Sequence, residues 1–172
     1  MTALAYAQNG FGLPLDFVKH TATPDYYNEG RDGESEAEFT ARCAAELEAL
    51  IIEEGPETVG ALFAEPVMGA GGVIVPPAGY FATIREVLER HDVLLVADEV
   101  ICGFGRTGEM WGSQTMDVRP DMLTCAKALS SAYLPISAVL MSDRVYDALA
   151  RQAESLGIFG HGYTYSAHPV CA

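Results

Sequence analysis

The sequence predicts an α/β fold in which a mostly parallel sheet is flanked by helices. Short, continuous apolar runs of strand length occur at Val59–Ala64, Val93–Ala97 and Met122–Ala126, which is typical of strands buried on both faces. A segment of helical period lies between the first two runs, and this strand–helix–strand order predicts a right-handed parallel crossover. The 172 residues suffice for one domain with a sizeable core.

Three segments are predicted to be helices. Glu34–Ile52 ends before Gly55-Pro56 and has apolar side chains at three- and four-residue spacings. These side chains are Phe39, Cys43, Leu47, Leu50 and Ile51. Ala78–Arg90 directs Phe81, Ile84, Val87 and Leu88 inward. Asp143–Gln152 follows a fourth predicted strand at Ile136–Met141.

The remaining segments are predicted to be irregular. Met1–Gly33 is rich in Gly, Pro, Tyr and Asn, with one short strand expected at Leu15–Val18. Loops are expected at Met68–Pro77 and Ala128–Leu134, and Leu156–Ala172 is irregular to its end.

Composition narrows the class of partners. The formal net charge is −14 and the sequence pI about 4.5, which argues against binding to nucleic acid or to an anionic membrane. The cysteines show no CxxC spacing and no histidine spacing suggests a triad, so no metal site is expected. The first basic residue is Lys19 and no apolar run could cross a bilayer. We therefore expect a cytoplasmic protein with reduced thiols, without a signal peptide.

Charged residues follow two of the predicted strands. Val93–Ala97 is followed by Asp98 and Glu99, and acids at the tip of a buried strand are expected to need a cationic partner. Met122–Ala126 is followed by Lys127, one of two lysines in the chain. A lysine in this apolar setting is expected to lose solvation and to act as nucleophile and base. Because ligands bind at the carboxyl ends of strands in open α/β sheets, both groups should face one crevice.

A carboxylate and an amine in one crevice suit pyridoxal 5′-phosphate, which needs a lysine for its Schiff base and an acid for its ring nitrogen. The blocks DEVICGFGRTG at Asp98–Gly108 and DMLTCAKALSSAY around Lys127 resemble the class III (ω-amino) aminotransferases of fold type I. The resemblance covers essentially the whole chain. It implies that residues 1–172 are the central part of the cofactor-binding large domain, with the N- and C-terminal parts of the family fold absent.

The resemblance also implies roles for four residues. Asp98 pairs with the pyridine nitrogen and Val100 packs flat against the ring. Lys127 forms the Schiff base and later moves a proton between the substrate α-carbon and the cofactor C4′. The block GHGYTYSAHP at Gly160–Pro169 implies that Thr164 binds the phosphate of the neighbouring subunit, so a homodimer is expected. Ala167 stands where the family usually has glycine.

Each of these residues also has a purely structural interpretation. Asp98 could cap a helix, Val100 could be an ordinary core valine, Lys127 a snorkelling surface lysine and Thr164 a turn hydroxyl. Arg106 either serves the cofactor loop or offsets Asp98 and Glu99. Glu65, in the block AEPVMGAGG, is not assigned to the site.

The implied activity is transfer of an amino group from an amine or ω-amino acid to a keto acid such as pyruvate. Ornithine-type enzymes have glutamine where Ile101 stands, which with the segment GLPLDFVKH favours the amine/β-alanine–pyruvate branch. The isolated chain is expected to bind cofactor weakly and to turn over little or not at all. An aminomutase of the same fold and a non-catalytic remnant remain alternatives.

A dinucleotide-binding oxidoreductase is disfavoured. Gly103–Gly108 spells GxGxxG, but acids separate it from the strand, and the following GEMWGSQ shows little helical periodicity.

Overall fold

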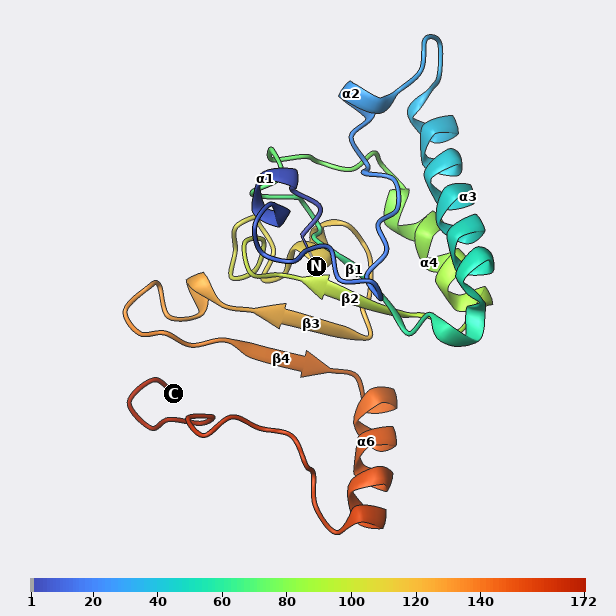
Figure 1. Ribbon diagram of the computed structural model, residues 1–172. Coiled ribbons are helices and arrows are strands. Elements are labelled where there is room, and N and C mark those ends of the chain that lie inside the picture. The colour runs from blue at the N-terminus through green and yellow to red at the C-terminus, as the bar shows by residue number, and fades with distance from the viewer. Residues whose placement is uncertain (1) are drawn as a thin grey trace.

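The computed structural model describes residues 2–172 and contains one four-stranded sheet in the order β1-β2-β3-β4 (Figure 1). Strands β1 (Ala61–Ala64), β2 (Leu94–Asp98) and β3 (Met122–Cys125) are parallel. Strand β4 (Ala138–Met141) pairs antiparallel with β3. The predicted α/β fold with a mostly parallel sheet is therefore confirmed.

Three long helices match the predictions with small shifts in their bounds. They are α3 (Glu36–Glu54), α4 (Tyr80–Arg90) and α6 (Asp143–Leu156). Helices α3 and α4 lie side by side, and α4 packs onto β2 (Figure 1). The core between them is built from the periodic apolar residues of the sequence, with Phe39, Ile51, Ile84, Leu88 and Leu95 almost fully buried.

Short elements complete the chain. Helices α1 (Ala5–Gln8), α2 (Tyr26–Glu29) and α5 (Gly112–Thr115) have one turn each, and 3₁₀ turns occupy η1 (Pro56–Thr58) and η2 (Lys127–Leu129). The segment predicted as irregular from Met1 to Gly33 is irregular around α1 and α2, and Met1 itself lies outside the described residues.

Two local predictions are wrong. Leu15–Val18 is a turn, closed by the Val18 N–H on the Leu15 carbonyl at 2.9 Å, and no strand forms there. The GEMWGSQ stretch was expected to be free of helix, yet it leads into α5. The first amides of α5 are already bonded to the Glu99 carboxylate.

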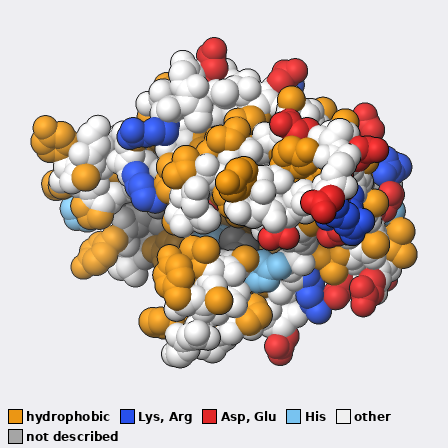
Figure 2. Space-filling view, turned by 90° about the horizontal axis from the view of Figure 1, so that it is seen from above, with side chains coloured by type: hydrophobic (Ala, Val, Ile, Leu, Met, Phe, Trp, Pro, Cys, Tyr) orange, Lys and Arg blue, Asp and Glu red, His pale blue; other side chains and the backbone are white. Residues whose placement is uncertain are grey.

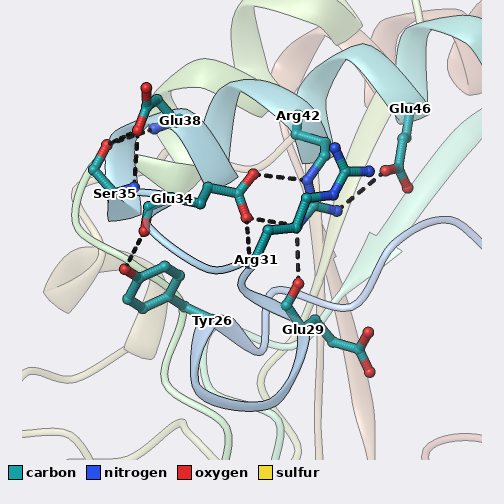
Figure 3. A network of polar contacts seen from close by, with 8 residues as sticks. All are labelled: Tyr26, Glu29, Arg31, Glu34, Ser35, Glu38, Arg42 and Glu46. Atoms are coloured by element: carbon teal, nitrogen blue, oxygen red, sulfur yellow. Dashed lines mark hydrogen bonds and ion pairs between the residues drawn. The ribbon is translucent and has the colours of Figure 1, made fainter.

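The start of α3 is held by a polar network (Figure 3). Ser35 caps the helix, since its hydroxyl and the Glu38 carboxylate exchange bonds with each other's backbone N–H. Arg42 reaches back to Glu34 at 2.8 Å and also bonds the Glu29 carbonyl at 2.9 Å. The hydrogen bond from Arg42, supported by the Arg31 N–H, lowers the pKa of Glu34 to about 2.

The other end of the molecule is less covered. Helix α6 is amphipathic but has no buried residue, and Val139 and Leu140 of β4 are about half exposed. Figure 2 shows hydrophobic side chains spread over the face seen from above, with acidic side chains gathered mainly toward one side. None of the helices within residues 2–172 is both long and apolar enough to cross a membrane.

Candidate cofactor site

Asp98 and Lys127 follow the carboxyl ends of two neighbouring parallel strands. In the register of β2 and β3, Asp98 lies opposite Thr124, and Lys127 comes three residues after Thr124. Because Leu95 faces the α3–α4 core and side chains alternate along a strand, Asp98 and Thr124 point to the opposite sheet face. The structure therefore brings the predicted acid and the predicted lysine to one edge of the sheet.

Only one of the two Asp98 carboxylate oxygens has a hydrogen-bond donor among the described residues. Its Oδ1 accepts the Val100 N–H at 3.0 Å, which forms a local Asx-type turn. Among residues 2–172, no hydrogen bond or ion pair engages Oδ2. The side chain is partly exposed, and Val100 beside it is half-buried. An acid with one free oxygen at a strand end fits a cationic ring nitrogen.

Lys127 occupies a strained turn. Its φ is +43°, in the left-handed region, and it opens the η2 turn just after the chain leaves β3. This conformation costs a non-glycine residue roughly 1–2 kcal/mol, and such outliers gather at functional sites. The side chain is exposed, so the expectation that apolar neighbours desolvate it is wrong. Strand β3 ends at Cys125, so Lys127 lies outside the sheet and its side chain is not covered by it.

Glu99 has a different partner from the one expected. Its side chain is completely buried at 0% exposure. Oε2 accepts the Gly112 N–H at 2.8 Å and Oε1 accepts the Ser113 N–H at 2.7 Å. The prediction of a cationic partner is wrong, because the amides at the start of α5 satisfy both oxygens. Arg106, the suggested counter-charge, is exposed and bonds neither Asp98 nor Glu99.

The loops that follow β1 and β2 pack tightly together. Cys102 Sγ donates to the Val67 carbonyl at 3.2 Å, and Glu65 Oε2 accepts the Gly69 N–H at 2.8 Å. A Cβ on Gly112 would lie 2.6 Å from the Cys102 Cβ and 2.9 Å from the Pro66 Cβ. The loops after β1 and β2 therefore have little room to shift relative to each other.

The glycines of the GxGxxG sequence, Gly103–Gly108, are needed for the backbone turns of this loop. Gly105 and Gly108 have φ of +89° and +103°, and a Cβ on Gly103 would lie 2.9 Å from the Glu99 carbonyl oxygen. No helix starts directly after Gly108, and the next one, α5, has its first amides bound to Glu99. The glycines are explained by backbone conformation and close approach.

Thr164 lies apart from these groups. It is exposed in a turn between Tyr163 and Ser166, in the segment that runs back beneath β4 after α6 (Figure 1). Ala167, where the family usually has glycine, adopts φ +55°, a conformation that glycine reaches without strain. The phosphate role of Thr164 stays a prediction.

Sequence reasoning missed Asp121. This residue is 7% exposed and lies just before β3. Its Oδ2 accepts the Leu95 N–H at 2.9 Å and a bond from Arg85 Nη1 at 2.8 Å. Burial alone would raise its pKa, but these two hydrogen bonds, together with the positive charges of Arg85 and Arg144, lower the pKa of the carboxyl. The sequence signal that could have identified Asp121 is its position directly before the apolar run Met122–Ala126.

Two cavities lie at this amino-terminal end of β3. Their volumes are about 590 and 500 Å³, and both are lined by Asp117–Asp121 and Ser142. Neither is lined by Asp98, Val100 or Lys127. They are therefore separate from the candidate cofactor site.

Within residues 2–172, the cysteines and His91 form no second candidate catalytic or metal site. Cys43, Cys102 and Cys125 are buried, and burial raises the pKa of each thiol. His91 Nε2 lies 3.0 Å from Glu48. Within the described residues, no group of three or more His, Cys, Asp or Glu could hold a metal ion.

Comparisons with known proteins show which proteins the chain resembles. The chain is 54% identical over its full length to gamma aminobutyrate transaminase 1, mitochondrial, of Solanum lycopersicum, covering 34% of that protein. It is 52% identical to vanillin aminotransferase of Capsicum frutescens, over 94% of this chain and 36% of that one. The chain thus spans about a third of the length of these relatives.

Solved structures give the same result. The omega transaminase from Pseudomonas jessenii in complex with PMP superposes with a TM-score of 0.96 at 50% identity, over 99% of this chain and 38% of that one. A transaminase with L-ala superposes with a TM-score of 0.95 at 54% identity, over 99% and 40%. The relatives include both mitochondrial and chloroplastic proteins.

The model of the family described as aminotransferase class-III matches residues 3–172. Enzymes of this family depend on pyridoxal phosphate, the cofactor that the strand-end acid and lysine suggested. On the family match, the sequence identities and the superpositions together, the chain belongs to the class III aminotransferases.

Proposed function

We propose that residues 1–172 are the central part of the cofactor-binding large domain of a transaminase. The observation that carries this proposal is the placement of Asp98 and Lys127 after the carboxyl ends of adjacent parallel strands. Relatives about three times as long, which share this whole segment, support the assignment as part of a domain. By itself the chain is proposed to bind cofactor weakly and to turn over little.

Each residue has one task in this proposal. Bound pyridoxal phosphate would supply an electron sink for the charge left at the substrate α-carbon. Lys127 would hold the cofactor through its Nζ, and its freed amine would carry the proton from the α-carbon. Asp98 would keep the ring nitrogen protonated through Oδ2, while Oδ1 stays on the Val100 N–H. Val100 would pack against the ring face.

The substrates follow the family. We propose transfer from an amine or ω-amino acid to a keto acid such as pyruvate. The gamma aminobutyrate and vanillin aminotransferases among the relatives carry names that fit ω-amino and amine chemistry. Thr164 would reach the phosphate of a second copy, so the working form would be a homodimer. The cytoplasm stays the proposed location.

The small number of lysines makes the proposal directly testable. Lys127 and Lys19 are the two lysines of the chain, and Lys19 pairs with Glu54 at 3.0 Å. The chain is treated with pyridoxal phosphate and borohydride, and each lysine's label is measured by peptide mass spectrometry. A small aldehyde without ring or phosphate gives the intrinsic reactivity ratio of the two amines.

We expect pyridoxal phosphate to favour Lys127 over Lys19 by about tenfold more than the small aldehyde does, a preference of about 1.4 kcal/mol. Asp98→Asn should reduce this excess, because the ring nitrogen loses its anionic partner. Equal ratios for the two aldehydes would contradict cofactor binding by this chain.

A further inference from the structure

The most buried charged side chain of the described structure has no assigned role. Glu99 is 0% exposed, directly between Asp98 and Val100. Burial of a carboxylate is unfavourable unless its oxygens are bonded, and here both oxygens accept backbone N–H groups of α5. These bonds fix the end of β2 relative to the start of α5, since Gly112 and Ser113 follow Glu99 by 13 and 14 residues.

The backbone of Glu99 is equally engaged. Its N–H donates to the Thr124 carbonyl of β3 at 2.9 Å, and its carbonyl accepts the Gly103 N–H at 2.9 Å. One residue therefore joins β3, the turn after β2 and the start of α5. Asp98 and Val100, its two neighbours, can move only if some of these bonds break.

We propose that Glu99 is a positioning residue that holds Asp98 and Val100 in place for the cofactor by fixing the ends of the segment Val100–Trp111. The proposal rests on the function proposed above. Glu99 does not touch the cofactor in this account. It acts through the strand end that carries Asp98 and through the turn that carries Val100.

The geometry also specifies why the residue is glutamate. Two N–H donors meet the side chain, so two acceptor oxygens are needed, and glutamine has one oxygen and one NH₂ group. In Glu99→Gln, a donor would face a donor. Aspartate keeps both oxygens but is one methylene shorter. A Cβ on Gly112 would lie 3.1 Å from Oε2 and 2.6 Å from the Cys102 Cβ, so a larger residue at position 112 would crowd both the carboxylate and Cys102.

The chain offers a matched control at the opposite end of the same strands. Asp121 is also buried, and it also accepts a backbone N–H, that of Leu95 in β2. Asp121→Asn disturbs a buried carboxylate between β2 and β3 at their other end. It should therefore lower stability without releasing the Val100–Trp111 segment.

Amide hydrogen exchange tests the hold on the segment without cofactor. In Glu99→Gln the exchange rates of the strand amides should all rise by a common factor that reflects lower stability. We expect the exchange rates of the Gly112 and Ser113 amides to rise by about tenfold more than this common factor. In Asp121→Asn the Leu95 amide should respond instead. Protection of Gly112 and Ser113 that follows only the shared shift in Glu99→Gln overturns the proposal. Glu99→Asp is the second variant if Glu99→Gln does not fold.

Lysine labelling tests the consequence for the cofactor. At a temperature where both variants are folded by circular dichroism, Glu99→Gln should lower the excess label on Lys127 while Asp121→Asn leaves it unchanged. Equal losses in the two variants at matched stability indicate a merely structural role and overturn the proposal. If the wild-type chain shows no excess on Lys127, cofactor binding by this chain is contradicted, and amide exchange alone decides whether Glu99 holds the segment.

Discussion

The Asp121 carboxylate takes the place of a backbone carbonyl toward Leu95: Oδ2 accepts the Leu95 N–H at 2.9 Å while the Asp121 N–H donates to the Leu95 carbonyl at 2.9 Å. The Asp121 carbonyl in turn accepts the Ser142 N–H at 2.8 Å, at the end of β4. One residue thus sets where β2, β3 and β4 meet. Arg85 of α4 joins the same carboxylate.

Replacing this carboxylate should weaken the whole sheet. In Asp121→Ala the Leu95 N–H and the Arg85 guanidinium lose a buried partner. We therefore expect the free energy of unfolding, measured by urea denaturation, to fall by about 3 kcal/mol. The matched control is Asp147→Ala on the exposed face of α6, which should change stability by less than about 0.5 kcal/mol. Similar losses in the two variants would contradict this role of Asp121.

Stability should fall as the solution is acidified. The pKa of Glu34 is lowered to about 2 and the pKa of Asp121 is also lowered, so the folded state binds protons less readily than the unfolded one. Their contribution is complete above the unfolded pKa values, near 4, and is lost as the pH falls toward the folded ones. Unfolding free energies measured between pH 7 and pH 2 should show this decline.

Glu34→Gln isolates one part of that pH dependence. The variant lacks the titrating carboxylate that Arg42 stabilises, so it should be less stable than wild type at pH 7. The difference should shrink as the pH falls below about 4. A difference that stays constant from pH 7 to pH 2 would exclude titration of Glu34 as its cause.

Gly112→Ala should be strongly unfavourable for packing. The new methyl would lie 2.6 Å from the Cys102 Cβ and 2.9 Å from the Pro66 Cβ, and overpacking of this kind costs about 1–3 kcal/mol. Gly60→Ala serves as control, since its Cβ would meet nothing within 4 Å. Chemical denaturation of both variants checks the difference, and equal stabilities would mean that the loops can yield.

The backbone of Lys127 gives a prediction that needs no cofactor. Both Lys127→Ala and Lys127→Gly remove the amine, but only glycine adopts φ +43° without strain. Lys127→Gly should therefore be the more stable of the two, by about 1 kcal/mol. Thermal melts of the pair measure this directly. A more stable alanine variant would show that the turn relaxes when the side chain is lost.

Much of the fold could be predicted because period and apolar runs report burial directly. Ile84 lies in a helical pattern of apolar residues and Leu95 in a continuous apolar run, and both are in the core. Leu15–Val18 shows where this reasoning fails, because its apolar residues lie in an irregular segment and find no neighbouring strand. Four residues carry too little pattern to separate a turn from a strand.

The positions of Asp98 and Lys127 at the strand ends could be predicted from the sequence, but the interactions around them could not. Strand-end position brought Asp98 and Lys127 together, since it follows from parallel topology. The partner of Glu99 could not be predicted, because backbone amides leave no trace in sequence composition. The exposure of Lys127 was missed for a related reason: apolar neighbours in sequence do not bury a side chain once the backbone turns out of the sheet.

The burial of three of the four cysteines has a practical use. Cys43, Cys102 and Cys125 are enclosed and Cys171 is partly open, so a maleimide dye should attach at one position, beside the carboxyl terminus. That dye would sit seven residues after Thr164 in the same exposed segment. Its fluorescence anisotropy would then report whether this segment becomes ordered when the proposed homodimer forms.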